Sequence, residues 1–149
     1  MAEILATLRE LAHICRDGER LYRQAATRMC SPDLREVAGE AGRIRGELYR
    51  EFAVLLREHG QHLGEAGTLY GRLRKRYTGL RAHFADSDRI YVRELECVED
   101  RLLHAMERAT LHLQPGEVRA LLRRHMPAAR AAHERMSTLR RELTDKAAA

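Results

Sequence analysis

Two histidines in the last part of the chain raise the question of metal chemistry. In helical bundles, a glutamate three residues before an inward-facing histidine is half of a di-iron or di-manganese site. The residue three before His125 is Leu122. The residue three before His133 is Arg130, so neither histidine has that glutamate. His125 still belongs to a helical seam with alternating spacings of four and three: Val118, Leu122, His125, Ala129, Ala132, Met136, Leu139 and Leu143.

Glutamates on two other predicted helices would complete a smaller site. Glu19 and Glu99 each lie beside the apolar seam of their helix, near its middle. Together with His125 and His133 they could form a mononuclear site, since carboxylate and imidazole ligands suit Fe, Mn or Zn. The alternative for Glu19 is an edge glutamate that pairs with an arginine. We expect no cofactor, with Fe, Mn or Zn as the alternative.

The apolar periodicity predicts an all-α protein of four long helices and one short helix, at about 2–29, 32–58, 68–84, 88–113 and 117–143. Ser31, Pro32 and Asp33 are typical of a helix N-terminus, and the short link makes the first two helices antiparallel neighbours. A tight turn at Pro115 joins the last two. Two hairpins joined by a long crossover, which holds the short helix, are the ferritin-like form of an antiparallel four-helix bundle. We expect residues 1–149 to form this single domain.

Several polar residues fall half-way along the predicted helices. Arg45 stands where the seam of its helix requires an apolar residue. Because an unpaired buried charge is costly, either Ile44 turns inward and Arg45 reaches solvent, or Arg45 meets a carboxylate inside. Gly18, on the seam of the first helix, indicates a close approach to the backbone. In place of a di-metal site we predict a hydrogen-bonded mid-bundle network of Glu19, Arg45, Glu47, Glu94 and Arg130.

The chain is moderately basic, with a formal net charge of +5 and a sequence pI near 9.5. One run of basic residues on the short predicted helix has no acid within it, and we call it the basic patch: Arg72, Arg74, Lys75, Arg76 and Arg81. A patch of this kind can attract nucleic acid or an anionic membrane. The favoured interpretation is a solvated face with counterions, and nucleic-acid or membrane binding is the alternative.

The cysteines and the apolar runs bear on the compartment. Cys15, Cys30 and Cys97 are odd in number and form no Cys-x-x-Cys pair, so neither a disulfide framework nor a thiolate zinc site is predicted. A reducing cytoplasm fits best. No apolar run reaches the ~18 residues needed to cross a bilayer, and the N-terminus lacks the pattern of a signal peptide. We expect a cytoplasmic protein without a transmembrane segment.

Several short segments resemble, in their order and spacing, an uncharacterised bacterial domain-of-unknown-function family of ferritin-like four-helix-bundle proteins. These segments are Asp17–Glu19 with Tyr22 and Ala25-Ala26, Glu96–Asp100, Pro115–Arg119 and Ala132–Met136. The similarity extends from about Leu5 to Leu143. It implies a fold and no particular activity.

The ferritin-like superfamily at large offers a glutamate from one helix of each hairpin and a Glu-x-x-His pair from the other. Here Glu47 is followed three residues later by Arg50. His133 is preceded by Arg130 at the other such position. Two ligand positions therefore carry a fixed positive charge, which repels a divalent cation and cannot coordinate it.

The favoured function is that of a non-enzymatic helical-bundle protein that acts by self-association, as a homo-oligomer, or by binding another protein. The sequence shows no set of nucleophile, base and oxyanion donors and no glycine loop for phosphates. The first alternative is a metal-binding ferritin-like protein that handles iron or acts as an oxidase. The second is a basic module that binds nucleic acid or an anionic membrane through the basic patch.

Overall fold

A computed structural model describes residues 1–64 and 84–149, with side chains from residue 87 onward in the second part. These residues form four long helices and no strand: α1 (Ala2–Arg28), α2 (Pro32–Glu58), α4 (Phe84–His112) and α5 (Glu117–Ala148). The predicted short helix at 68–84 lies almost wholly outside the described residues. So does the whole basic patch of Arg72, Arg74, Lys75, Arg76 and Arg81, whose role stays a prediction from the sequence.

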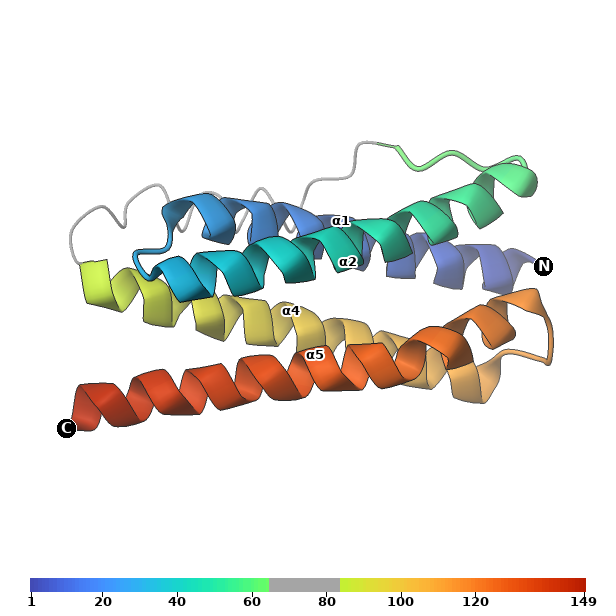
Figure 1. The fold of residues 1–149 in the computed structure, drawn as a ribbon. Helices are drawn as coiled ribbons and strands as arrows, with labels where there is room; N and C mark the ends of the chain where they lie inside the picture. The colour runs from blue at the N-terminus through green and yellow to red at the C-terminus, as the bar shows by residue number, and fades with distance from the viewer. Residues whose placement is uncertain (65–83) are drawn as a thin grey trace.

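The four helices pack side by side as a bundle, as Figure 1 shows. α1 packs against α2, α4 packs against α5, and α1 and α4 join the two pairs. Each pair is antiparallel, and α2 and α4 run in the same direction (Figure 1). The all-α prediction of four long helices is confirmed, although α5 continues to Ala148 instead of ending near residue 143. It also continues through Pro127 as one helix.

The turn between α1 and α2 is held by local and distant contacts. Ser31 is the N-cap of α2, where its Oγ accepts a hydrogen bond from the backbone N–H of Leu34, and Pro32 follows at the start of the helix. Asp88, near the start of α4, accepts hydrogen bonds from the backbone N–H groups of Cys30 (2.6 Å) and Ser31 (3.0 Å). The Asp88 carboxylate therefore holds the N-terminal end of α4 against this turn.

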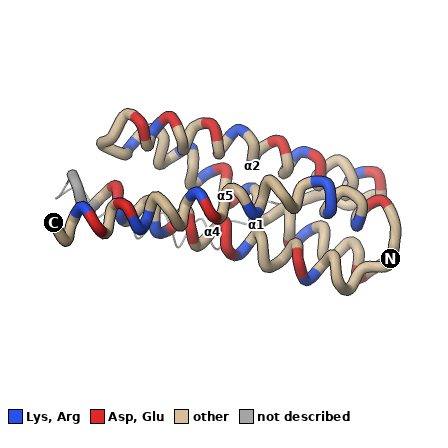
Figure 2. Tube along the Cα trace, turned by 60° about the horizontal axis from the view of Figure 1, so that its bottom comes forward, with Lys and Arg blue, Asp and Glu red and all other residues tan. Residues whose placement is uncertain are grey.

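The interior consists of two apolar clusters separated by a polar layer. One cluster surrounds Phe52 and Leu102, and the other surrounds Tyr22 and Leu95. Between them lie buried or mid-helix polar residues, above all Arg45 on α2 and Glu99 on α4. Basic and acidic residues are interspersed along all four helices, as Figure 2 shows. The helices therefore position a charged pair between the two apolar clusters.

The predicted close approach at Gly18 is confirmed. A Cβ atom at this position would lie 3.0 Å from Cγ1 of Val98 and 3.3 Å from Cγ of Arg45. Gly42 plays the same part in α2, because a Cβ there would lie 2.9 Å from Cβ of Tyr22. Glycine at these two positions allows α1 to approach both partner helices closely beside the polar layer.

Candidate functional site

The centre of the polar layer is a buried cluster of three side chains from three helices: Tyr22 of α1, Arg45 of α2 and Glu99 of α4. The Tyr22 hydroxyl donates a hydrogen bond to Oε1 of Glu99 (2.6 Å), and Nη2 of Arg45 donates to Oε2 (2.5 Å). Glu99 is 1% exposed and Arg45 is 3% exposed. Both carboxylate oxygens therefore have donors, one of them charged, as a buried carboxylate requires.

The electrostatics of this buried cluster favour a fixed ion pair. Burial opposes the charge of Arg45, but the neighbouring Glu99 carboxylate outweighs it and raises the pKa of the guanidinium above its ordinary value. Burial and then the Glu99 charge raise the pKa of Tyr22 well above its ordinary value, so its hydroxyl stays a donor. Burial likewise raises the pKa of the nearby Cys15 thiol to about 12, which keeps it protonated and a poor nucleophile.

The structure selects one of the two alternatives for Arg45. The Arg45 side chain turns inward to a carboxylate, whereas Ile44 is 42% exposed. Glu99 neutralises the charge of Arg45, but the Nε–H of Arg45 makes no hydrogen bond within the described residues.

The other members of the predicted mid-bundle network lie elsewhere, which corrects that prediction. Glu19 pairs with Arg23 on the same helix (2.8 Å), as its edge alternative required, and its carboxylate lies over Gly46 of α2. Two more residues pair at the surface: Glu47 with Arg43 (2.6 Å) and Arg130 with Glu107 (3.6 Å). Their long side chains reach water, so they need no partner in the core. Glu94 is buried and lies 3.9 Å from Arg93, the residue before it in α4.

The two histidines have separate carboxylate partners. Nε2 of His125, on α5, lies 3.1 Å from Oε2 of Glu51 on α2, and Arg124 donates to the same oxygen (2.7 Å). Burial alone would raise the pKa of Glu51, but the hydrogen bonds and charges of His125 and Arg124 outweigh it and lower that pKa. Nε2 of His133 lies 3.3 Å from Oδ1 of Asp100 on α4. His125 is thus half-buried in a polar contact, not on the axis of the bundle.

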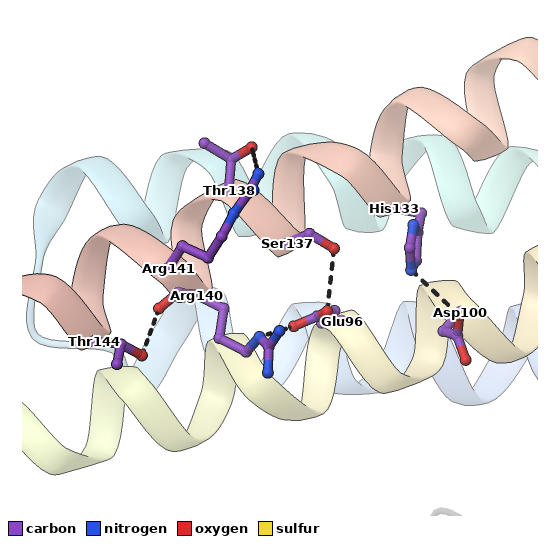
Figure 3. A network of polar contacts seen from close by, with 8 residues as sticks. All are labelled: Glu96, Asp100, His133, Ser137, Thr138, Arg140, Arg141 and Thr144. Atoms are coloured by element: carbon purple, nitrogen blue, oxygen red, sulfur yellow. Dashed lines mark hydrogen bonds and ion pairs between the residues drawn. The ribbon is translucent and has the colours of Figure 1, made fainter.

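His133 and Asp100 belong to a surface cluster along the seam between α4 and α5, shown in Figure 3. Ser137 donates a hydrogen bond to Oε1 of Glu96 (3.1 Å), and Arg140 forms an ion pair with the same carboxylate. The side chain of Asp100 is 54% exposed and that of Arg140 is 49% exposed. These contacts join the two helices of the hairpin where water reaches them.

The four predicted metal ligands are therefore not brought together. Glu19, Glu99, His125 and His133 each have a different partner, as described above. Within residues 1–64 and 84–149, no group of three or more histidine, cysteine, aspartate or glutamate side chains is arranged to hold a metal ion. A carboxylate that already bonds a guanidinium is a poor ligand for a divalent cation.

The sequence alone does not identify the partners of three residues that the structure makes important. The hydroxyl of Tyr22 is buried, and a buried hydroxyl requires an acceptor nearby. Glu51 bridges α2 to α5, and Asp88 bridges α4 to the first turn. Their partners lie far away in the chain, so no local spacing points to them.

A cavity of about 260 Å³ lies beside the buried cluster, between α2 and α5. Its walls are mostly apolar, and Arg45 forms part of its lining. The other residues that matter here are Glu40, Ala41, Ile44 and Leu48 from α2 and His125, Ala128, Ala132 and Arg135 from α5. The α2–α5 face is therefore hollowed beside the polar layer.

In residues 1–64 and 84–149, fold and site together define an all-α bundle of four long helices with a buried Tyr–Glu–Arg cluster at its centre. None of the helices in the described residues combines the length and apolar character needed to span a membrane. The family known as Domain of unknown function (DUF2383) matches residues 3–112, and the chain belongs to it. No curated protein matches the chain.

Proposed function

We propose that this chain is a non-enzymatic helical-bundle protein that acts by associating with other protein chains and holds no resident metal. The observation that carries the proposal is the ion pair between Arg45 and Glu99 at the centre of the bundle. In di-metal proteins with this type of bundle, inward carboxylates hold cations at that place. Here a guanidinium occupies the position of a cation and already uses the carboxylate.

The connectivity that we propose is ferritin-like, with residues 1–149 as one domain. Its support is the pair of antiparallel hairpins and the parallel course of α2 and α4 in Figure 1, an arrangement of helices that ferritin-like bundles share. The protonated thiol of Cys15 beside the buried cluster supports the absence of nucleophilic chemistry there. All three cysteines are free, which supports a cytoplasmic location.

Metal analysis tests the absence of a resident metal. Protein purified from media with and without added iron, manganese and zinc should contain each metal well below one equivalent. Adding Fe²⁺, Mn²⁺ or Zn²⁺ should leave the midpoint of thermal unfolding unchanged, because only a ligand that binds the native state raises it. One equivalent of metal that disappears in Glu99→Gln would overturn this part of the proposal.

A further inference from the structure

The least closely packed side of the bundle lies between α2 and α5. α1 is packed on α2 and on α4, and α4 on α5, whereas among the described residues α2 and α5 make few close backbone contacts. The cavity of about 260 Å³ occupies this gap. A helical bundle normally closes such a seam with interdigitating side chains. The α2–α5 face therefore has room for side chains that another molecule supplies.

The two sides of this face differ in side-chain size. α2 contributes Ile44, a branched apolar residue that is 42% exposed beside the cavity. α5 contributes Ala128 and Ala131, which are both exposed, and the half-buried Ala132. A helix laid over these alanines can approach α5 closely, because interaxial distance depends on the side chains at the contact. The face thus presents a protruding residue on one helix and a shallow surface on the other.

Contacts at one end of the cavity establish which residues lie opposite one another. Glu51 of α2 bonds both Arg124 and His125 of α5, so these residues are level along the bundle axis. The two helices run in opposite directions with the same rise per residue. Seven residues before Glu51 in α2 is Ile44, and seven residues after Arg124 and His125 in α5 are Ala131 and Ala132. Ile44 is therefore level with these two alanines.

The same count gives the charges at the other end of the cavity. Eleven residues from the Glu51 contact, Glu40 of α2 is level with Arg135 of α5. Both line the cavity. Within the described residues, neither Glu40 nor Arg135 takes part in an ion pair with another side chain. Glu40 and Arg135 lie at one level on opposite sides of the gap. If a second copy is rotated by 180° to face this one, Glu40 of each copy lies opposite Arg135 of the other.

We propose that the α2–α5 face binds a second copy of this chain about a two-fold axis parallel to the helices. This rotation lays α2 of each copy over α5 of the other without changing the level of any residue. Ile44 then packs on Ala131 and Ala132 of the second copy. Glu40 meets Arg135 of the second copy, and symmetry forms this ion pair twice. The inference rests on the proposed function, since it names the chain with which the bundle associates.

Oligomeric state measured by light scattering after gel filtration tests the surface. The wild-type chain should be a dimer, and Ile44→Arg should be a monomer, because a charge would be buried opposite the alanines. Val54→Arg is the matched control. Val54 lies on the same helix and is also 42% exposed, but it does not line the cavity, so this variant should remain a dimer.

Charge reversal tests the orientation. Glu40→Arg and Arg135→Glu should each weaken dimerisation by about tenfold, since each creates two like-charge contacts at the symmetric interface. The double variant E40R/R135E should restore the wild-type affinity, because both ion pairs form again with their signs exchanged. Circular dichroism should show native helix content in all three, since both positions are exposed.

Each other outcome overturns the proposal. If the wild-type chain is monomeric at all concentrations, the α2–α5 face does not bind a second copy of this chain. A dimer that survives Ile44→Arg lies on another surface, and if that variant does not fold, Ala128→Arg gives the same test. A double reversal that fails to restore affinity excludes this axis. A metal-bound dimer, by contrast, would contradict only the metal-free part of the proposed function.

Discussion

Two neighbouring acids of α4 have opposite surroundings. Glu99 is buried between Tyr22 and Arg45, whereas Asp100 lies on the surface next to His133. Consecutive helical residues point about 100° apart, so one carboxylate faces the bundle interior and the other faces water. Both lie within ion-pair distance of a basic side chain. The difference shows that the surroundings of an ion pair decide its contribution to stability more than its geometry does.

The reason is the cost of removing charges from water. In the interior this cost has been met for both partners, and the loss of one partner leaves the other charged, buried and unpaired. At the surface a broken pair is replaced by hydration, so little free energy is lost. Substitutions in the two regions should therefore have effects of very different size.

The largest expected effect is that of Glu99→Ala. It leaves Arg45 as an uncompensated buried charge and Tyr22 without its acceptor. The free energy of unfolding should fall by about 3–5 kcal/mol. Urea denaturation followed by circular dichroism measures it, and a loss below about 1 kcal/mol would remove the distinction between the two regions.

A paired replacement separates charge from packing in the same region. The double variant Arg45→Met/Glu99→Leu removes both charges while keeping apolar volume in the core. It should be more stable than Glu99→Ala alone, because a buried ion pair replaced by apolar residues often costs nothing. A double variant as unstable as the single one would show that packing, and not the uncompensated charge, causes the loss.

Next in size is Tyr22→Phe, which removes only the neutral donor to Glu99. One carboxylate oxygen is left without its hydrogen bond in the core, so the free energy of unfolding should fall by about 1–3 kcal/mol. The matched control is Tyr49→Phe, because Tyr49 is only half-buried. That variant should stay within about 0.5 kcal/mol of the wild type. Equal losses in the two variants would contradict the interpretation.

On the surface side, Arg140→Ala should cost less than about 1 kcal/mol. It removes the ion pair with Glu96 in the cluster of Figure 3, where water can hydrate the carboxylate that remains. Denaturation at low and high salt measures the effect, which should shrink further as salt screens the pair. A salt-independent loss as large as that of Glu99→Ala would contradict the comparison.

The smallest expected effect is the contribution of Glu51 to stability, which should be lost at acidic pH. The pKa of Glu51 is lowered in the folded chain, so its charged form contributes stability above the ordinary glutamate value of about 4.5 and loses it as the pH falls through the lowered value. Glu51 is partly exposed, so solvent screening keeps this contribution below about 1 kcal/mol. Glu51→Gln should be less stable than the wild type at neutral pH, and the two should converge in acid. If the difference in stability between Glu51→Gln and the wild type grows as the pH falls, the lowered pKa of Glu51 is contradicted.

Some parts of the site could be predicted because they depend on one helix at a time. The seam spacing placed Arg45 where an apolar residue is expected and left open whether Arg45 or Ile44 turns inward, and the glycine at position 18 indicated the close approach that is observed. Glu19 and Glu99 were both candidates for an inward acid, because each lies beside its own seam. In the structure Glu19 pairs with the exposed Arg23, whereas Glu99 pairs with the buried Arg45. This difference depends on how the helices are rotated relative to one another.

By itself, the sequence determined that this chain forms long amphipathic helices, since periodicity, caps and propensities act within a few residues. Only the tertiary structure decided that Arg45 meets Glu99, 54 residues away, and that the histidines lie with Glu51 and Asp100. A helix turns by about 100° per residue, so a small rotation of one helix exchanges the partner that each side chain meets. That rotation is set by the packing of all four helices together.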